Sequence, residues 1–262
     1  MGKVIHSTQF GPHHALRRAL ERHARERFRR PIADFNRKAF ETAARNAERI
    51  GGAIILDSGC GNGASTIMLA GRFPGHCVIG VDKSAARLER APGRPSNCLL
   101  VHTNLVDFWR LAAAAGWRLE RHFLLCPNPW PKSRHLGRRW HGHPAWPSML
   151  ALGGRVELRT NWSIYASEFA LALEWAGARD IVSCHAPAAP LSPFERKYRA
   201  WGETIYRVAA ELTSRGDDDG LDQRALGRWS EPRGQSGASA GGERPGETTF
   251  QNPRFTPGRR DA

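Results

Sequence analysis

The hydrophobic pattern is clearest in residues 53–83, where two apolar runs of strand length flank a helical pattern. The runs are residues 53–56 and 77–81, and the helical positions span residues 64–73. A glycine-rich turn joins the first run to the helix, and an aspartate closes the second run. A strand, a glycine turn, a helix and a second strand in this order predict one βαβ unit of the nucleotide-binding type.

Apolar runs and helical patterns continue to alternate on the carboxyl side of this unit. On its amino side, Asp34 is expected to cap a helix that stops at Gly51. Strands separated by helices are typical of a parallel sheet with helices on both faces, so we predict an α/β fold with a doubly wound, mostly parallel, seven-stranded sheet. The further strands are predicted at residues 97–102, 122–126, 155–159, 180–184 and 203–209, and the other helices at 14–30, 34–50, 84–91, 104–115, 146–152 and 163–176.

The spacing of the glycine-rich turn indicates what it binds. Gly59, Gly61 and Gly63 let the backbone turn sharply and approach a ligand without a Cβ in the way. Asp82, about twenty residues further on, stands where a carboxylate accepts hydrogen bonds from ribose hydroxyls. Asp57 leads the turn, which has no basic residue to meet a pyrophosphate. Because S-adenosylmethionine carries an ammonium and a sulfonium, we interpret this acid-led turn as the cofactor site of a methyltransferase.

The charge of the chain is unevenly distributed. The 262 residues have a formal net charge of +14, but residues 214–262 hold eight arginines and eight acidic residues and are neutral overall. The positive excess therefore lies in residues 1–213 and indicates a polyanionic partner such as RNA. We predict a basic helical extension at residues 1–33, a methyltransferase domain at 34–213 and a disordered tail, rich in glycine, serine and proline, at 214–262.

The cysteines and the hydropathy of the chain indicate the cellular compartment and whether a metal is bound. None of the five cysteines forms a CxxC pair, which predicts no metal site and a reducing compartment. The sequence has no amino-terminal apolar segment and no run long enough to span a bilayer. These features predict a soluble, cytoplasmic protein.

The longest polar segment between predicted strands is the loop 127–144. It carries four cations, three histidines and two tryptophans, a mixture that grips phosphates and stacks on bases. Because ligands of a doubly wound sheet bind beyond the carboxyl ends of the strands, this loop is expected beside the glycine turn. We predict that Arg134, Arg138 and Arg139 contact the RNA backbone.

Five motifs together resemble the bacterial tRNA (guanine-N7-)-methyltransferases. In order, they are DSGCGNG, GVDKS, PNPWPKSRHLGRR, RTNW and SPFERK, and the resemblance spans roughly residues 53–208. It implies a class I, Rossmann-like methyltransferase that transfers a methyl group from S-adenosylmethionine to N7 of a guanine in the tRNA variable loop.

The resemblance also implies roles for individual residues. It places Asp57, Gly59, Gly61, Gly63, Asp82, Asn104 and Asn128 at the cofactor, with Asn128 also at the catalytic position. It assigns Lys132, Asn161, Ser192, Pro193, Phe194 and Glu195 to the tRNA substrate. The family normally has aspartate where this chain has asparagine at 104, 128 and 161, and threonine where it has Ser192.

Two alternative functions remain open from the sequence. Asn128-Pro129-Trp130 also resembles the Asn-Pro-x-aromatic motif of amino-group methyltransferases, in which the asparagine and the proline carbonyl accept hydrogen bonds from an exocyclic amine. The three asparagines at family aspartate positions also fit a non-catalytic RNA-binding paralogue with a vestigial cofactor site. The chemical identity of the methylated product, or its absence, separates the three readings.

Overall fold

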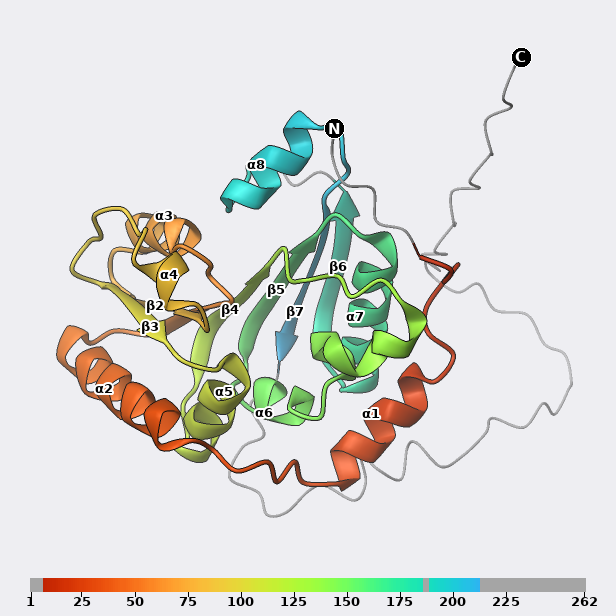
Figure 1. Ribbon diagram of the computed structural model, residues 1–262, viewed down its shortest axis with the longest axis horizontal. Coiled ribbons are helices and arrows are strands. Elements are labelled where there is room, and N and C mark those ends of the chain that lie inside the picture. Colours follow the sequence, from red (N-terminus) through yellow and green to blue (C-terminus); the bar gives the residue numbers. More distant parts are fainter. Residues whose placement is uncertain (1–6, 186–188, 213–262) are drawn as a thin grey trace, which may run out of the picture. The chain divides into compact units, whose positions relative to one another are not determined.

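In the computed structural model, which describes residues 7–185 and 189–212, seven strands form one sheet in the order β3-β2-β1-β4-β5-β7-β6 (Figure 1). The first five strands pair in parallel, and β7 runs antiparallel to both β5 and β6. The predicted α/β fold with a mostly parallel, seven-stranded sheet is confirmed. The strands are β1 (Ile54–Ser58), β2 (Cys77–Asp82), β3 (Cys98–His102), β4 (Leu119–Leu125), β5 (Gly154–Thr160), β6 (Arg179–His185) and β7 (Tyr206–Leu212).

Helices cover the sheet, and the side chains of successive strand residues point to its opposite faces. Ile55 belongs to a smaller apolar cluster with residues of α3, whereas Leu56 belongs to the larger cluster with α1, α2, α5, α6 and α7. This alternation is the period of two that a strand buried on both faces requires. The helices are α1 (Leu16–Arg25), α2 (Asp34–Ile50), α3 (Ala64–Arg72), α4 (Ala85–Leu88), α5 (Leu105–Ala114), α6 (Trp146–Leu150), α7 (Ser163–Trp175) and α8 (Pro193–Ala200).

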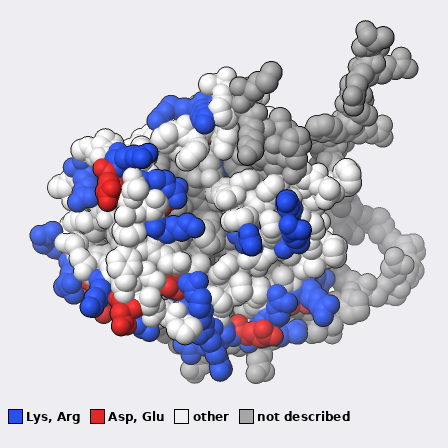
Figure 2. Space-filling model, in the orientation of Figure 1, with Lys and Arg blue, Asp and Glu red and all other residues white. Residues whose placement is uncertain are grey.

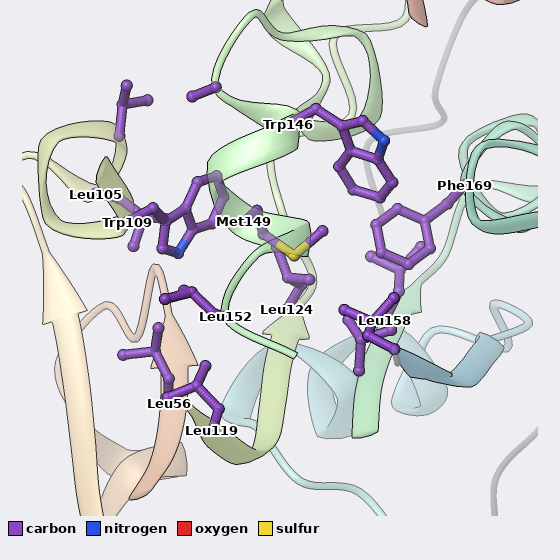
Figure 3. Packing of buried hydrophobic residues seen from close by; sticks show 14 of the residues in the cluster. Leu56, Leu105, Trp109, Leu119, Leu124, Trp146, Met149, Leu152, Leu158 and Phe169 are labelled. Atoms are coloured by element: carbon purple, nitrogen blue, oxygen red, sulfur yellow. The ribbon is translucent and has the colours of Figure 1, made fainter. Parts of the chain in front are cut away.

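The larger core cluster is built around aromatic side chains and Met149. Figure 3 shows Met149 between Trp109 on one side and Trp146 with Phe169 on the other. The rings of Trp146 and Phe169 meet edge to face, with centroids 5.4 Å apart. Trp109 and Met149 are fully buried, so α5, α6 and α7 are fixed against the same side of the sheet.

The arginine-rich amino-terminal helix contributes to this core. In α1, Leu16, Ala19 and Leu20 are buried in the larger cluster, and the arginines lie on the other faces of the helix. The helix contacts α6 and α7, so apolar packing holds it to the domain. The boundary at residue 33 stays a prediction, and the predicted disordered tail lies outside the described residues.

Some local features differ from the sequence predictions. The N-cap of α2 is Ala33, and Asp34 is the first helical residue, where its charge favours the positive end of the helix dipole. The last strand begins at Tyr206 instead of residue 203. The preceding segment contains α8, which the periodicity did not indicate because only one of its eight residues, Glu195, is buried.

Candidate active site

The glycine-rich turn lies at the carboxyl end of β1 and leads into α3. Gly59, Gly61 and Gly63 have positive φ angles of 79°, 63° and 76°. A Cβ at Gly59 or Gly61 would meet no atom within 4 Å, whereas one at Gly63 would come within 2.8 Å of the Leu100 side chain. The first two glycines are thus required for backbone conformation, and open space lies beside them.

Asp57 is a buried carboxylate with one satisfied oxygen and one unsatisfied oxygen. Its Oδ2 accepts hydrogen bonds from Ser65 Oγ at 2.6 Å and from Thr66 Oγ1 at 2.8 Å. Its Oδ1 is buried and has no hydrogen-bond partner. Burial raises the pKa of Asp57 to about 6, although the two hydroxyl donors act in the opposite direction. A buried carboxylate oxygen without a partner is uncommon in folded proteins, and here it lies at the end of β1, just before the glycine turn.

Asp82 ends β2 and ties this strand to the glycine turn. Its Oδ2 accepts a hydrogen bond from the Gly61 N–H at 3.0 Å. Its Oδ1 accepts from the Ser84 N–H at 2.9 Å and pairs with Arg87 at 3.1 Å. Because a carboxylate offers about four acceptor positions, these three contacts leave one of them unused.

Asn104 follows β3 and is the N-cap of α5. Its Oδ1 accepts hydrogen bonds from the N–H groups of Val106 at 3.0 Å and Asp107 at 3.4 Å. Asparagine caps a helix about as well as aspartate, so the amide keeps this structural role. The Asn104 N–H in turn donates to Asn36 Oδ1 at 3.1 Å.

Asn36 is a residue of this region that the sequence predictions missed. It is buried on α2 and donates through Nδ2 to Asp107 at 2.7 Å, while its Oδ1 also accepts from Thr103. The available signal was its position on the helical face of Phe40 and Ala43, where a polar side chain needs a partner.

A cavity of about 180 Å³ opens beside the glycine turn. The turn and Arg87 form one side of it, and Leu125 at the end of β4 and the segment 192–194 form another. The structure thereby brings together the predicted cofactor turn and the predicted substrate segment. The three asparagines at 104, 128 and 161 are not among the residues that line this cavity.

The loop after β4 has an unusual backbone where it leaves the sheet. Cys126 and Trp130 have φ angles of 53° and 47°, which non-glycine residues rarely adopt. The Cys126 N–H donates to the Arg159 carbonyl at 2.8 Å, and the Trp130 N–H donates to Asn128 Oδ1 at 3.4 Å. Asn128 is exposed between these two strained positions. Strained backbone of this kind is frequent at ligand-binding sites.

The sequence prediction that Arg139 contacts the RNA backbone is wrong. Its side chain is 0% exposed and reaches away from the surface to Glu168 on α7. Its Nη1 lies 2.7 Å and 2.6 Å from the two carboxylate oxygens of Glu168, and its Nη2 donates to the Trp130 carbonyl at 3.2 Å. Arg139 therefore holds the loop to the domain and has no surface to offer a phosphate.

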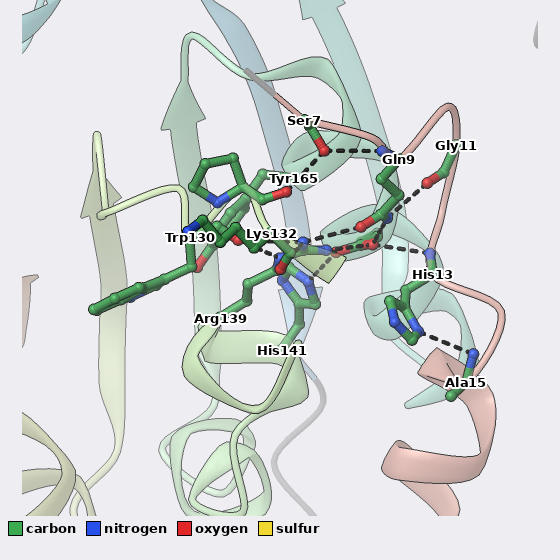
Figure 4. A network of polar contacts seen from close by, with 12 residues as sticks. Ser7, Gln9, Gly11, His13, Ala15, Trp130, Lys132, Arg139, His141 and Tyr165 are labelled. Carbon is green, nitrogen blue, oxygen red and sulfur yellow. Dashed lines mark hydrogen bonds and ion pairs between the residues drawn. The ribbon is translucent and has the colours of Figure 1, made fainter. Parts of the chain in front are cut away.

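Glu168 is the centre of a polar network that fixes the loop and the residues before α1. It accepts hydrogen bonds from Gln9 Nε2 at 2.6 Å, the His13 N–H at 2.9 Å and His141 Nε2 at 2.8 Å. Figure 4 shows Gln9, Arg139 and His141 converging, whereas the His13 ring points toward Ala15 and only its backbone N–H joins the network. Burial tends to raise the pKa of Glu168, but the hydrogen bonds from His141 and Arg139 lower it to about 2. The sequence signal for this network was the position of Glu168 between apolar residues of α7, where a buried carboxylate needs partners.

The other three cations of the loop remain accessible. Lys132, Arg134 and Arg138 are exposed, and the Arg138 guanidinium lies 4.7 Å from the centroid of the Trp130 ring. Figure 2 shows that the upper part of this face carries many more basic than acidic side chains. The electrostatics of this surface favour a polyanion.

The SPFE motif forms the first turn of α8 and buries its glutamate. Ser192 is the N-cap, and its Oγ accepts a hydrogen bond from the Glu195 N–H at 3.2 Å. Glu195 Oε2 accepts from Arg159 Nη1 at 2.9 Å, whereas Oε1 is buried without a hydrogen-bond partner. Burial raises the pKa of Glu195 against the effect of the Arg159 charge. A second unpaired carboxylate oxygen thus lies behind the segment that lines the cavity.

Asn161 follows β5 and lies against an acidic side chain. Its Nδ2 donates a hydrogen bond to Glu203 Oε2. Glu203 lies in the turn between α8 and β7, and its N–H donates to the Tyr198 carbonyl at 3.0 Å. A carboxylate is therefore present next to position 161 even though residue 161 itself is an amide.

Within residues 7–185 and 189–212, no three histidine, cysteine, aspartate or glutamate side chains gather in a way that would hold a metal ion. In the same residues, no helix combines the length and the apolar character needed to cross a bilayer.

Comparisons with known proteins show which family the chain resembles. Residues 52–208 match the model of a family described as putative methyltransferase. A tRNA (guanine-N(7)-)-methyltransferase of Anaeromyxobacter dehalogenans (strain 2CP-C) is 33% identical over 173 residues, which are 60% of this chain and 85% of the relative. One of Mycobacterium avium (strain 104) is 35% identical over 127 residues, 45% of this chain and 48% of the relative, so the chain spans about half the length of that protein.

Among solved structures, the crystal structure of the 16S rRNA methyltransferase KamB is similar, with a TM-score of 0.50 and 14% identity over 70% of this chain and 95% of that chain. At this identity the likeness concerns the fold alone. The family match covers more than half of the chain, and the Anaeromyxobacter dehalogenans relative is covered over most of its length. The chain therefore belongs to the tRNA (guanine-N(7)-)-methyltransferase family, a family of putative methyltransferases.

Proposed function

We propose that this chain is an S-adenosylmethionine-dependent RNA methyltransferase that methylates N7 of a guanine in the variable loop of tRNA. The observation that carries the proposal is the shared cavity: the glycine turn and the Ser192–Phe194 segment, far apart in sequence, line it together. The names of the related proteins support the choice of substrate. The predicted cytoplasmic location is part of this proposal, since it depends on the same substrate.

The residues around the turn fit the chemistry of S-adenosylmethionine. The unpaired Asp57 Oδ1 would accept a hydrogen bond from a cationic ligand, and the remaining acceptor position of Asp82 would take a ribose hydroxyl. The open space at the Cβ positions of Gly59 and Gly61 leaves room for a ligand to approach the backbone. Asn104, which caps α5 at the end of β3, is proposed to lie near the adenine.

The chemistry requires little proton transfer from the protein. When bound, S-adenosylmethionine supplies a methyl group on a sulfonium centre. Guanine N7 carries a free lone pair, so transfer depends on positioning and on electrostatic support. We assign the positioning to Asn128, whose exposed amide is held between two strained backbone positions and offers both a donor and an acceptor.

A carboxylate is suited to recognise the N1 and N2 donors of guanine. Glu195 is fully buried and bonded to Arg159, so we assign it the role of holding the cavity-lining Ser192–Phe194 segment in place. Glu203 accepts from the Asn161 amide and supplies a charge where the family resemblance implies an aspartate. We assign to Glu203 the role that a carboxylate at position 161 would have, with Asn161 orienting it.

The exposed cations of the loop are proposed to hold the RNA backbone. Lys132, Arg134 and Arg138 lie on the surface, and Trp130 with its strained backbone lies beneath the Arg138 guanidinium. Cations with an adjacent aromatic ring suit both phosphates and bases.

The test is direct. The full chain is incubated with methyl-labelled S-adenosylmethionine and total RNA, and the labelled RNA is identified and digested to nucleosides. The expected product is 7-methylguanosine in tRNA. An N-methylated exocyclic amine would instead assign Asn128-Pro129-Trp130 to amino-group methylation. RNA binding without any single-turnover transfer would assign a non-catalytic role.

A further inference from the structure

Helix α8 carries a row of aromatic side chains that its packing does not require. Phe194, Tyr198 and Trp201 follow one another at positions i, i+4 and i+7, which lie on one face of a helix. The rings of Phe194 and Tyr198 are stacked with centroids 6.3 Å apart, and those of Tyr198 and Trp201 are 6.0 Å apart. Phe194 is 48% exposed and Trp201 is 40% exposed, and Tyr198 between them is half-buried, so both ends of the row face solvent.

The row starts at the cavity and runs away from it. Phe194 lines the cavity, whereas Tyr198 and Trp201 do not. At the start of the helix, Ser192 Oγ lies 4.0 Å from Cys126 Sγ at the end of β4, which is where the loop containing Asn128 begins. The aromatic row therefore continues outward from the point where the cofactor turn, the β4 loop and α8 meet.

Basic side chains accompany the aromatic row. Arg196 and Lys197 are exposed on α8, and Lys197 Nζ lies 4.5 Å from the centroid of the Trp201 ring. The single acidic residue of the helix, Glu195, is fully buried. Figure 2 shows the basic side chains of α8 at the top of the view. Exposed aromatic rings flanked by cations form the surface on which unpaired bases stack while phosphates are neutralised.

We propose that α8 is a stacking platform for unpaired nucleotides that flank the methylated base, with Tyr198 and Trp201 as the stacking residues and Lys197 at the phosphates. The proposal rests on the proposed function, because it takes the cavity as the place of the target nucleotide. It adds a substrate class: RNA whose modified guanine lies in an unpaired segment, with the adjacent bases available for stacking. The charge of the helix favours RNA over an apolar protein partner.

The experiment compares a short unpaired RNA oligonucleotide containing guanine with the same sequence annealed into a duplex. Binding of the full chain is measured over a range of salt concentrations. Tyr198→Ala and Trp201→Ala should each weaken binding of the unpaired RNA by about tenfold with an unchanged salt slope, because stacking carries no counterion release. Trp201→Phe should retain most of the affinity. Lys197→Ala should instead reduce the salt slope by about one.

Controls separate this proposal from folding defects and from the proposed function. Val182→Ala, which alters an exposed apolar residue on β6, should bind RNA like the wild type, and thermal unfolding of each variant checks the fold. Methyl transfer by the wild type is measured in parallel. Alanine variants that bind unpaired RNA like the wild type while the wild type transfers methyl groups would overturn the platform alone. Stacking-dependent binding without methyl transfer would support the platform and overturn the enzymatic function, and no RNA binding at all would overturn both.

Discussion

The buried carboxylates of Glu168 and Asp57 differ in how completely their oxygens are hydrogen-bonded. Both oxygens of Glu168 are bonded, with donors from Gln9, His13, Arg139 and His141. Asp57 has two hydroxyl donors on one oxygen and none on the other. The pKa of Glu168 is lowered to about 2, and burial raises that of Asp57 to about 6.

The difference separates a charge that stabilises the fold from one that the fold leaves only partly bonded. A buried charge surrounded by donors fixes the elements that supply them, here the β4 loop, the residues before α1 and α7. A buried carboxylate with a vacant acceptor costs stability until a donor arrives, and such groups cluster at functional sites. Five predictions follow from this contrast, ordered from the largest expected effect to the smallest.

The largest effect should follow from breaking the satisfied site. Arg139→Ala leaves Glu168 with an uncompensated buried charge and should lower the free energy of unfolding by about 3–5 kcal/mol. Denaturant unfolding measures this, and the neighbouring Arg138→Ala is the matched control, because its side chain is exposed. The Arg138→Ala variant should change stability by less than about 0.5 kcal/mol. Equal stability of the two variants would refute the structural role of Arg139.

Substitution of the partly bonded Asp57 should change the free energy of unfolding in the opposite direction. Because burial raises the pKa of Asp57 in the folded protein from its usual value of 3.8 to about 6, its contribution to stability falls as pH rises between these values and is constant above them. Asp57→Asn should therefore raise the free energy of unfolding at neutral pH, by up to about 3 kcal/mol, while weakening S-adenosylmethionine binding.

The same substitution makes a pH prediction for the cofactor. Wild-type affinity for S-adenosylmethionine should increase as pH rises through about 6, and the Asp57→Asn variant should lack this dependence. Calorimetric titration at several pH values measures it, with the exposed Asp34→Asn as control. If the Asp57→Asn variant binds S-adenosylmethionine like the wild type at neutral pH, Asp57 does not contact the cofactor.

Glu203 provides an intermediate test, since it is a carboxylate held by one amide donor. Glu203→Gln should lower kcat/KM for tRNA by about tenfold, the cost of one hydrogen bond to a charged group, with cofactor affinity unchanged. Adding Asn161→Asp to this variant places a charge on the hydrogen-bond partner of residue 203 and should restore part of the loss. A double variant no better than the single one would argue against a carboxylate role at this place.

The smallest effect is expected at the surface cations. Lys132→Ala should weaken tRNA binding a few-fold and reduce the slope of log affinity against log salt by about one, as for a single phosphate contact. Binding measured over a salt series, with stability unchanged, tests this. An unaltered slope would show that Lys132 does not contact an RNA phosphate.

Much of the architecture could be predicted from the sequence because it depends on local patterns. The apolar run before Asp57, the glycine spacing and the run ending at Asp82 specify a βαβ unit without reference to the rest of the chain. Their positions in the structure differ by only a few residues from those predicted. The order of the further apolar runs was enough to predict a mostly parallel sheet. The SPFE segment was identified by its resemblance to a family motif, although the helix that it begins was not predicted.

The roles of polar side chains depended on burial, which local patterns do not specify. Arg138 and Arg139 are adjacent in the sequence, yet one lies over Trp130 at the surface and the other is enclosed with Glu168. From the sequence alone, Asn161 indicates that a negative charge is missing at this position, but the fold brings the Glu203 carboxylate beside it.

The sequence by itself determined the fold class, the acid-led glycine turn and the family of this protein. Only the tertiary structure decided which charges are satisfied and which, like Asp57 Oδ1, keep a vacant position. The physical reason is that helix and strand periodicity act over a few residues. The energy of a buried charge, in contrast, depends on donors delivered from distant parts of the chain.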